Sequence, residues 1–345
     1  LYKLKENQSI DGAFSWFKGM ETNRYITQYI IGGFGHLKKI GIYSDKIDPT
    51  VLKITDSGVR YLDKKIREDY EFLKQQVKIN GISLKDYHLN PLIIQYLYIR
   101  SFFPELKISS NNIEAYKYFY DQAMKYKFKE NIYSRGMIAL VLHRNGDTKN
   151  AKKILESLRE NAIETKEMGT YWKSDWSYIW YEMPVETQSL LIECFYEIEG
   201  ESEFLNNMKT WLLKNKQTNE WSSTKSTSEA IYSLLLGNSD IKKTVLPEVS
   251  IGEQILAVDS PALKAEAGTG YFKTSFSERE ISPSMGKIKI ESKSKNIAFG
   301  GLYWQYFENL DKITPASTPL KIKKKIFLQK VSDRGTVLLP LKSET

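Results

Sequence analysis

Two glutamates that follow a run of aromatic side chains have the clearest chemical potential in this sequence. Glu182 and Glu186 stand four residues apart, and Trp172, Trp176 and Trp180 precede them. Aromatic side chains that stack on sugars, together with two carboxylates, are what a glycosidase needs. A glutamate at the start of a helix is also ordinary, because it interacts favourably with the helix dipole. Carbohydrate hydrolysis and a structural role are therefore both open for this pair.

Cys194 is the only cysteine and lies within the apolar run "ETQSLLIECFYEIEG". Leu190, Phe195 and Ile198 surround it at helical spacing, which places it on the apolar face of a predicted helix. It is also far from a helix N-terminus that would lower its pKa, and it has no partner for an internal disulfide. The sequence predicts a buried, unreactive thiol.

Metal and phosphate sites are not predicted. His36, His88 and His143 are widely separated and form no metal-binding motif. The glycines of "IGGFGHL" (31–37) lack the Lys-Ser/Thr ending of a phosphate loop, so we expect them to allow close helix packing. No cofactor is expected.

Helical spacing of apolar residues dominates residues 24–237 and predicts about nine helices, mostly paired as hairpins with short turns. Asn90 and Pro91 form a predicted helix start, and Asn145-Gly146 a predicted stop, after which Asp147 begins the next helix. We expect no strands before residue 230.

After Leu246 the apolar residues alternate with period two, which predicts antiparallel strands. The candidate strands are "KIKIES" (287–292), "IAFGGLYWQYF" (297–307), "KIKKKIFLQK" (321–330) and "TVLLPL" (336–341). The sequence therefore predicts an all-α domain over residues 1–240 and a β domain over residues 241–345.

A faint internal repeat supports stacked helical hairpins. Trp16 precedes Thr27 by eleven residues, as Trp176 precedes Thr187, and each Thr begins a Thr-Gln pair at the start of an apolar helix. "EWSSTKSTSEAIYSLL" is a shortened form of the same pattern.

The overall composition is that of a soluble globular protein, with 41% hydrophobic and 27% charged residues. The net charge of +8 comes from scattered lysines, which does not favour nucleic-acid binding. No apolar run approaches the roughly 20 residues that span a bilayer. Because the chain begins "LYKLKENQ", without Met or an apolar signal, we expect it to be a piece of a longer protein.

Several segments resemble the bacterial alpha-2-macroglobulin family in the same order along the chain. They are "DGAFSWFKGMETNRYITQYIIGGFGHLKKIG", "VETQSLLIECFYEI", "WLLKNKQTNEWSSTKSTSEAIYSLL" and "GGLYWQYFENLDKITPASTPLKIKKKIF". The resemblance implies an α/α toroid, the thioester-domain fold, followed by a β-sandwich. It also implies a periplasmic or cell-envelope protein that traps proteases, whose partners are the neighbouring macroglobulin domains and a trapped protease.

Many members of that family carry an internal thioester in a Cys-x-Glu-Gln motif, which this chain lacks. Cys194 is followed by Phe-Tyr-Glu, and the similar Ile251-Gly252-Glu253-Gln254 has Ile in place of the sulfur. The leading hypothesis is a non-enzymatic domain without a thioester of its own. A carbohydrate-active α/α-toroid enzyme using Glu182 and Glu186 and a purely structural scaffold are the alternatives.

The segment "TYWKSDWSYIWYEMPVE" (170–186) is a candidate partner contact. Aromatic side chains in exposed loops are enriched at interfaces, and Trp172 and Trp176 beside Glu182 are the candidates. The core is nevertheless the favoured position of Trp172, Trp176 and Trp180, since large aromatic side chains are usually mostly buried.

Overall fold

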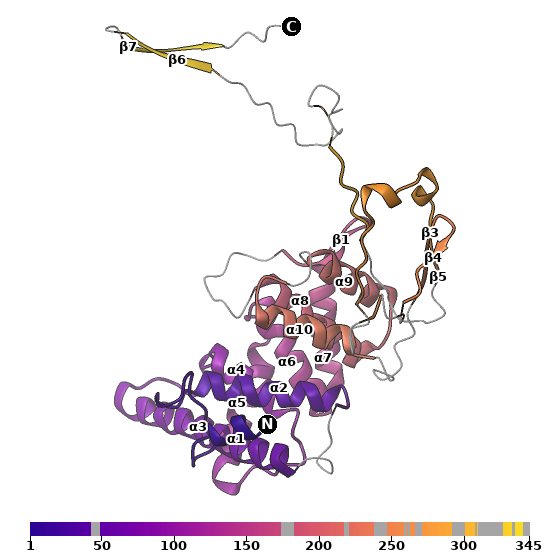
Figure 1. Cartoon of the computed structure of the whole chain (residues 1–345). Coiled ribbons are helices and arrows are strands. Elements are labelled where there is room, and N and C mark those ends of the chain that lie inside the picture. The colour runs from indigo at the N-terminus through magenta and orange to yellow at the C-terminus, as the bar shows by residue number, and fades with distance from the viewer. Residues whose placement is uncertain are drawn as a thin grey trace. The chain divides into compact units, whose positions relative to one another are not determined.

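A computed structural model gives the architecture of the chain (Figure 1). The residues it describes are 1–42, 49–173, 183–216, 221–237, 247–258, 260, 263–265, 271–291, 301–307, 309, 327–332 and 335–340. The chain divides into two compact units, Leu1–Phe299 and Gly300–Thr345. The predicted boundary near residue 240 falls among residues that lie outside this description.

The first unit is built mainly from α-helices, nine of which follow one another among the described residues after the short α1 (Tyr2–Glu6). They are α2 (Arg24–Lys39), α3 (Pro49–Asn80), α4 (Pro91–Arg100), α5 (Ser110–Tyr126), α6 (Ile132–Arg144), α7 (Thr148–Glu160), α8 (Pro184–Glu199), α9 (Glu203–Lys214) and α10 (Thr224–Leu235). The predicted helical region is confirmed. None of the helices in the described ranges is long and apolar enough to cross a membrane.

Helix boundaries follow the capping residues of the sequence. The Asn90 side chain accepts a hydrogen bond from the backbone N–H of Ile93, and Pro91 is the first residue of α4. The α6–α7 turn is equally local, because Gly146 has a φ of +90° and the Asp147 side chain accepts from the backbone N–H of Asn150. Both predicted helix boundaries are confirmed.

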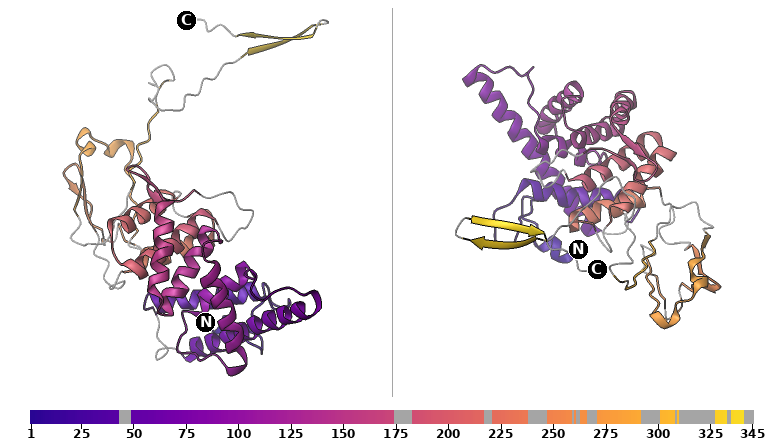
Figure 2. Two further views of the ribbon diagram at one scale, coloured as in Figure 1. Left: turned by 180° about the vertical axis from the view of Figure 1, so that it is seen from behind. Right: turned by 90° about the horizontal axis from the view of Figure 1, so that it is seen from above.

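The helices alternate between two layers. Figure 2 shows the ribbon from two further sides. The even-numbered helices α2, α4, α6, α8 and α10 pack on one another in that order, and we call them the inner helices. The outer helices cover them: α3 packs on α2, α7 on α6 and α8, and α9 on α8. The inner helices α4, α6 and α8 are buried over most of their length, which places the core between the layers.

Glycines allow α2 and α4 to approach closely, as predicted. A methyl group added at Gly35 would lie 2.6 Å from Cγ of the Phe102 ring, which follows α4, and one at Gly32 would lie 3.3 Å from Ile99. Gly33 points to open space. The packing role of this motif therefore belongs to two of its three glycines.

Two Thr-Gln pairs of the internal repeat have the same structural role. Gln28 and Gln188 are both buried, and each donates its side-chain amide to a backbone carbonyl of a neighbouring element. The acceptors are Leu92 at 3.2 Å and Thr170 at 2.8 Å. Each amide thereby fixes the start of an inner helix.

A short β-hairpin interrupts the helices between α7 and α8, so the expectation of no strand before residue 230 is wrong. Strands β1 (Ile163–Thr165) and β2 (Gly169–Tyr171) pair antiparallel, and β2 packs on α9. Gly169 has a φ of +81°, and a Cβ there would lie 2.3 Å from the Asn207 carbonyl oxygen, so this contact requires glycine.

The C-terminal third contains small antiparallel sheets. In the first unit, β3 (Glu248–Ile251), β4 (Gln254–Ile255) and β5 (Ile288–Glu291) form a sheet of order β4-β3-β5, with 3₁₀ turns at Glu278–Glu280 and Pro283–Gly286. In the second unit, β6 (Phe327–Ser332) pairs with β7 (Gly335–Pro340). The switch from helices to antiparallel strands is confirmed, but residues 301–307 are not a strand, so that prediction is wrong.

Candidate functional site

Trp172 lies in the core, which is the position that the sequence favours for it, and not at the surface where a partner contact would need it. Its side chain is 6% exposed, and its indole N–H donates to the backbone carbonyl of Leu158 near the end of α7, with Nε1 and O 2.7 Å apart. Its ring also packs on Phe195 and Phe204. Trp172 directly follows β2, which packs on α9. Trp176 and Glu182 lie outside the described residues.

Glu186 is a buried carboxylate near the start of α8. It is 2% exposed, and Oε1 accepts a hydrogen bond from the Ser226 hydroxyl of α10 at 2.8 Å. Oε2 is buried without a hydrogen-bond partner. Because Glu182 lies outside the description, the distance between the two predicted carboxylates is not defined.

Cys194 is completely buried in the middle of α8, as predicted. Its thiol donates to the backbone carbonyl of Gly136 on α6, with Sγ and O 3.0 Å apart. Burial raises the pKa of this thiol well above its ordinary value. Since the thiolate is the reactive form, the environment makes Cys194 a poor nucleophile.

The inner helices converge on a group of polar side chains, buried except for Lys39, that we call the central network. It consists of His36 and Lys39 (α2), Tyr98 (α4), Arg144 (α6), Glu193 and Glu197 (α8) and Tyr232 (α10). At its centre Arg144 Nη2 lies 2.6 Å from Glu193 Oε1 and 2.6 Å from Glu197 Oε1. These three charged side chains are each at least nine-tenths buried.

Two tyrosines and a lysine complete the hydrogen bonding of the glutamates. The hydroxyls of Tyr98 and Tyr232 donate to the two carboxylate oxygens of Glu193, at 2.5 Å and 2.6 Å. Lys39 lies 3.0 Å from Glu197 Oε2. Each carboxylate therefore has partners on at least two other elements.

The charges of the central network hold one another in place. Burial disfavours the charged form of Arg144, but Glu193 and Glu197 outweigh it and raise the pKa of this arginine well above its ordinary value. Burial raises the pKa of Glu193, with Arg144 opposing it. Burial acts in the same direction on Glu197, but Arg144 and Lys39 prevail and lower the pKa of that carboxyl. The network is thus a compensated ionic cluster.

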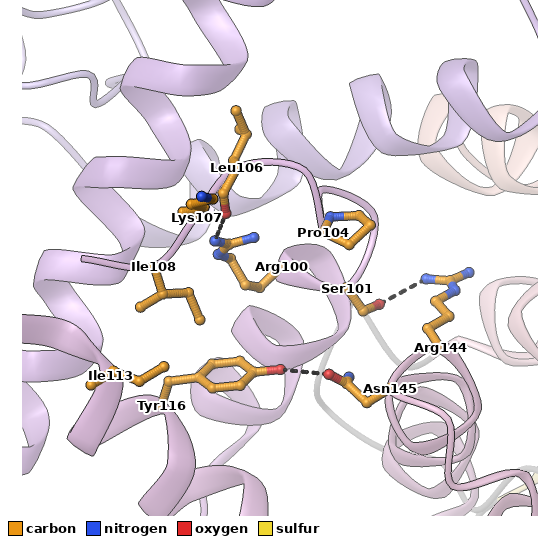
Figure 3. A pocket seen from close by; sticks show the side chains of 10 residues that line it. All are labelled: Arg100, Ser101, Pro104, Leu106, Lys107, Ile108, Ile113, Tyr116, Arg144 and Asn145. Carbon is orange, nitrogen blue, oxygen red and sulfur yellow. Dashed lines mark hydrogen bonds between the residues drawn. The ribbon is translucent and has the colours of Figure 1, made fainter. Parts of the chain in front are cut away.

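A surface pocket of about 420 Å³ opens next to the central network, where α4 and α6 end and α5 begins (Figure 3). Its lining residues are Arg100, Ser101, Pro104, Leu106, Lys107, Ile108, Ile113, Tyr116, Arg144 and Asn145. The two arginines are already bonded: Arg100 to Asp63 at 3.0 Å, and Arg144 to the Ser101 hydroxyl at 3.0 Å as well as to its glutamates. The guanidinium groups therefore serve mainly to hold the pocket walls.

Sequence reasoning missed the central network, because its members come from five helices. A signal was present in α8, where Glu193 and Glu197 stand one turn apart in a helix that is otherwise apolar around them. Buried charges require partners, so such a pair predicts a cation on a neighbouring helix.

Comparisons with known proteins do not assign a function to this chain. Neither a protein-family model nor a curated protein matches this chain. Within the described ranges, no three His, Cys, Asp or Glu side chains are grouped so as to hold a metal ion.

Proposed function

We propose that this chain is a non-enzymatic domain of a protease-trapping cell-envelope protein of the alpha-2-macroglobulin type, with no thioester of its own. The alternation of inner and outer helices supports the α/α toroid that the sequence resemblance implies. The small antiparallel sheets after residue 247 support the expectation of β-sandwich material. In this proposal the domain serves as a rigid body that contacts neighbouring domains of the parent protein and a trapped protease.

The non-enzymatic part of the proposal rests on one observation, which is that the charged groups of the central network are bonded to one another. A catalytic centre needs polar groups that converge on a space for the substrate. Here Arg144, Glu193 and Glu197 are bonded to one another and to the surrounding tyrosines and lysine. Cys194, the one residue that could form a thioester, is buried against Gly136.

A trapping assay on the parent protein tests this proposal. A protease enclosed in a trap keeps its active site but is shielded from large substrates. Incubation of the parent protein with a secreted protease should therefore leave cleavage of a small chromogenic peptide intact while suppressing digestion of casein. A protease that digests both substrates at its normal rate would contradict trapping and favour a purely structural scaffold.

A carbohydrate-active enzyme is the second candidate function, and Glu186 is the residue that supports it. Its Oε2 atom is a buried carboxylate oxygen without a hydrogen-bond partner, unlike the paired oxygens of Glu193. Such an oxygen could act on a substrate if the site opens. A screen for reducing ends released from polysaccharides tests this. Activity that is lost in Glu186→Gln but kept in Glu203→Gln, an exposed glutamate at the start of α9, would support the enzyme and contradict our main proposal.

A further inference from the structure

The end of α5 and the turn that follows it alternate lysines with aromatic residues, in the sequence "KYKFK" (125–129). Lys125, Phe128 and Lys129 are exposed, with Phe128 at 47%, whereas Tyr126 and Lys127 are half-buried. The ammonium groups of Lys125 and Lys129 lie 4.6 Å and 4.9 Å from the centroid of the Tyr126 ring. The Lys127 ammonium lies 5.3 Å from the centroid of the Phe128 ring. Positive charge and aromatic surface therefore occur side by side at this turn.

Hydrogen bonds hold the turn in place. The backbone N–H of Lys129 donates to the Tyr126 carbonyl at 2.8 Å. Arg135 of α6 donates Nη2 to the Phe128 carbonyl at 3.1 Å and Nε to the Glu130 carbonyl at 2.7 Å. Because this backbone is already ordered, a partner that binds here does not have to order it.

The segment between α3 and α4 extends the same surface. The Lys85 carbonyl accepts from both the Lys125 ammonium and the Tyr126 hydroxyl, each at 2.7 Å. Tyr87 is 41% exposed and packs edge-to-face on Tyr126, with the ring centroids 5.4 Å apart. We call the combined area the basic aromatic surface, and its members are Lys85, Tyr87, Lys125, Tyr126, Lys127, Phe128 and Lys129.

The basic aromatic surface is positively charged. In the segments 85–87 and 125–130, four lysines stand against Asp86 and Glu130. Glu130 Oε1 accepts a hydrogen bond from the Tyr87 hydroxyl at 2.7 Å, which occupies that oxygen. The charged residues around these segments balance one another, and they are Arg135, Lys153, Asp121 and Asp147. The surface therefore favours a negatively charged partner.

The rings favour a lipid bilayer over a nucleic acid as this partner. Single-stranded nucleic acids stack their bases on aromatic rings. At Tyr126 and Phe128, however, lysine ammonium groups lie over the rings where bases would stack. A bilayer requires no stacking, because aromatic side chains enter the membrane interface while lysines extend toward the lipid phosphates.

We propose that the basic aromatic surface attaches this chain to a bilayer that contains anionic phospholipids. Phe128 enters the boundary between headgroups and acyl chains, and Lys127 and Lys129 on either side of it contact lipid phosphates. The attachment is peripheral and reversible, because few side chains take part in it. It goes beyond the trapping function proposed above and does not require it.

Co-sedimentation of the full chain with vesicles tests this attachment. The vesicles contain either phosphatidylcholine alone or equal parts of phosphatidylcholine and phosphatidylglycerol. Each lysine near an anionic surface strengthens binding about fivefold, so Lys127→Gln/Lys129→Gln should bind the anionic vesicles about twentyfold more weakly than wild type. Wild type should bind neutral vesicles at least about tenfold more weakly than anionic ones. Its binding to anionic vesicles should also fall as the salt concentration rises from about 0.1 M to about 1 M.

Lys53→Gln/Lys64→Gln is the matched control for charge. It removes two exposed lysines from the first half of α3, whereas the basic aromatic surface includes the segment that follows the end of α3. Its binding should fall by less than about threefold. Phe128→Ser should weaken binding about tenfold through lost apolar contact. Phe17→Ser, at a side chain 72% exposed in the segment before α2, should leave binding unchanged.

Equal losses in the test and control variants, or equal binding to neutral and anionic vesicles, would overturn the proposal. Absence of binding to anionic vesicles would also overturn it, and binding of single-stranded RNA in that case would assign the surface to nucleic acid. If a variant fails to fold, hydrogen–deuterium exchange of wild type decides. Anionic vesicles should slow exchange at residues 81–90 and 124–131, and protection confined to other segments would refute the attachment.

Discussion

Replacing Arg144 by Met tests the reading of the central network as a compensated ionic cluster. The change keeps an unbranched side chain of similar reach but leaves Glu193 and Glu197 without their shared cation. Their carboxylates have exposed fractions of 1% and 3%, so water cannot replace the guanidinium. The guanidinium carbon also lies 3.9 Å from the centroid of the Phe102 ring, a contact that Met cannot reproduce as a cation.

The expected loss follows from the burial of the ion pairs. Removing one partner of a buried pair costs about 3–5 kcal/mol, because an uncompensated charge remains. Arg159→Met is the matched control, since Arg159 pairs with Glu199 and lies 4.6 Å from the Phe204 ring centroid, but its side chain is 43% exposed. An exposed pair of this kind contributes up to about 1 kcal/mol.

The pH dependence separates lost charge compensation from lost packing. Without Arg144, burial raises the pKa of Glu193 and Glu197, and a carboxyl with a raised pKa in the folded state gains stability as the pH falls. The gap between wild type and Arg144→Met should therefore narrow between about pH 7.5 and about pH 5.5. Urea denaturation followed by circular dichroism measures it at both values. A loss no larger than that of Arg159→Met, or a gap independent of pH, would refute the reasoning.

Three further substitutions, two of them paired with a control, test the packing of the helical region. Gly35→Ala should lower the free energy of unfolding by about 1–3 kcal/mol, because its methyl group meets an aromatic ring. Gly33→Ala should instead stabilise α2 by up to about 1 kcal/mol. Thermal unfolding ranks the two variants. Cys194→Ala should cost about 1 kcal/mol, and the native thiol should resist a thiol reagent that labels it at once in urea. Trp172→Phe should cost about 1–3 kcal/mol in the same melts through its lost hydrogen bond and volume, while Trp16→Phe, at a side chain 47% exposed, should leave stability unchanged.

Local signals in the sequence predicted the helical part of the fold well. Asn90-Pro91 and Asn145-Gly146-Asp147 fix helix ends through contacts within a few residues, so their positions can be derived without tertiary structure. The β1–β2 hairpin escaped prediction because its strands have three residues each and depend on the contact of Gly169 with α9.

The surroundings of the candidate functional residues depend on tertiary contacts, which the spacing of residues in the sequence does not reveal. Trp172 stands in a segment without a clear period, and its contacts in the core are with Leu158, Phe195 and Phe204 of other elements. Cys194 was predictable because its apolar neighbours belong to its own helix. Arg144 and Glu193 belong to different inner helices, so no sequence window contains the pair.

The contact between α2 and α10, where the rings of His36 and Tyr232 stack, has a consequence for the order in which the protein folds. The α6–α7 hairpin joins neighbours across a turn of three residues, Asn145 to Asp147, so little loop entropy opposes its early formation. Contact between His36 and Tyr232 instead requires almost the whole helical region to be in place first. We therefore expect the contact between α2 and α10 to form late in folding, with the apolar face of α10 exposed to aggregation until then.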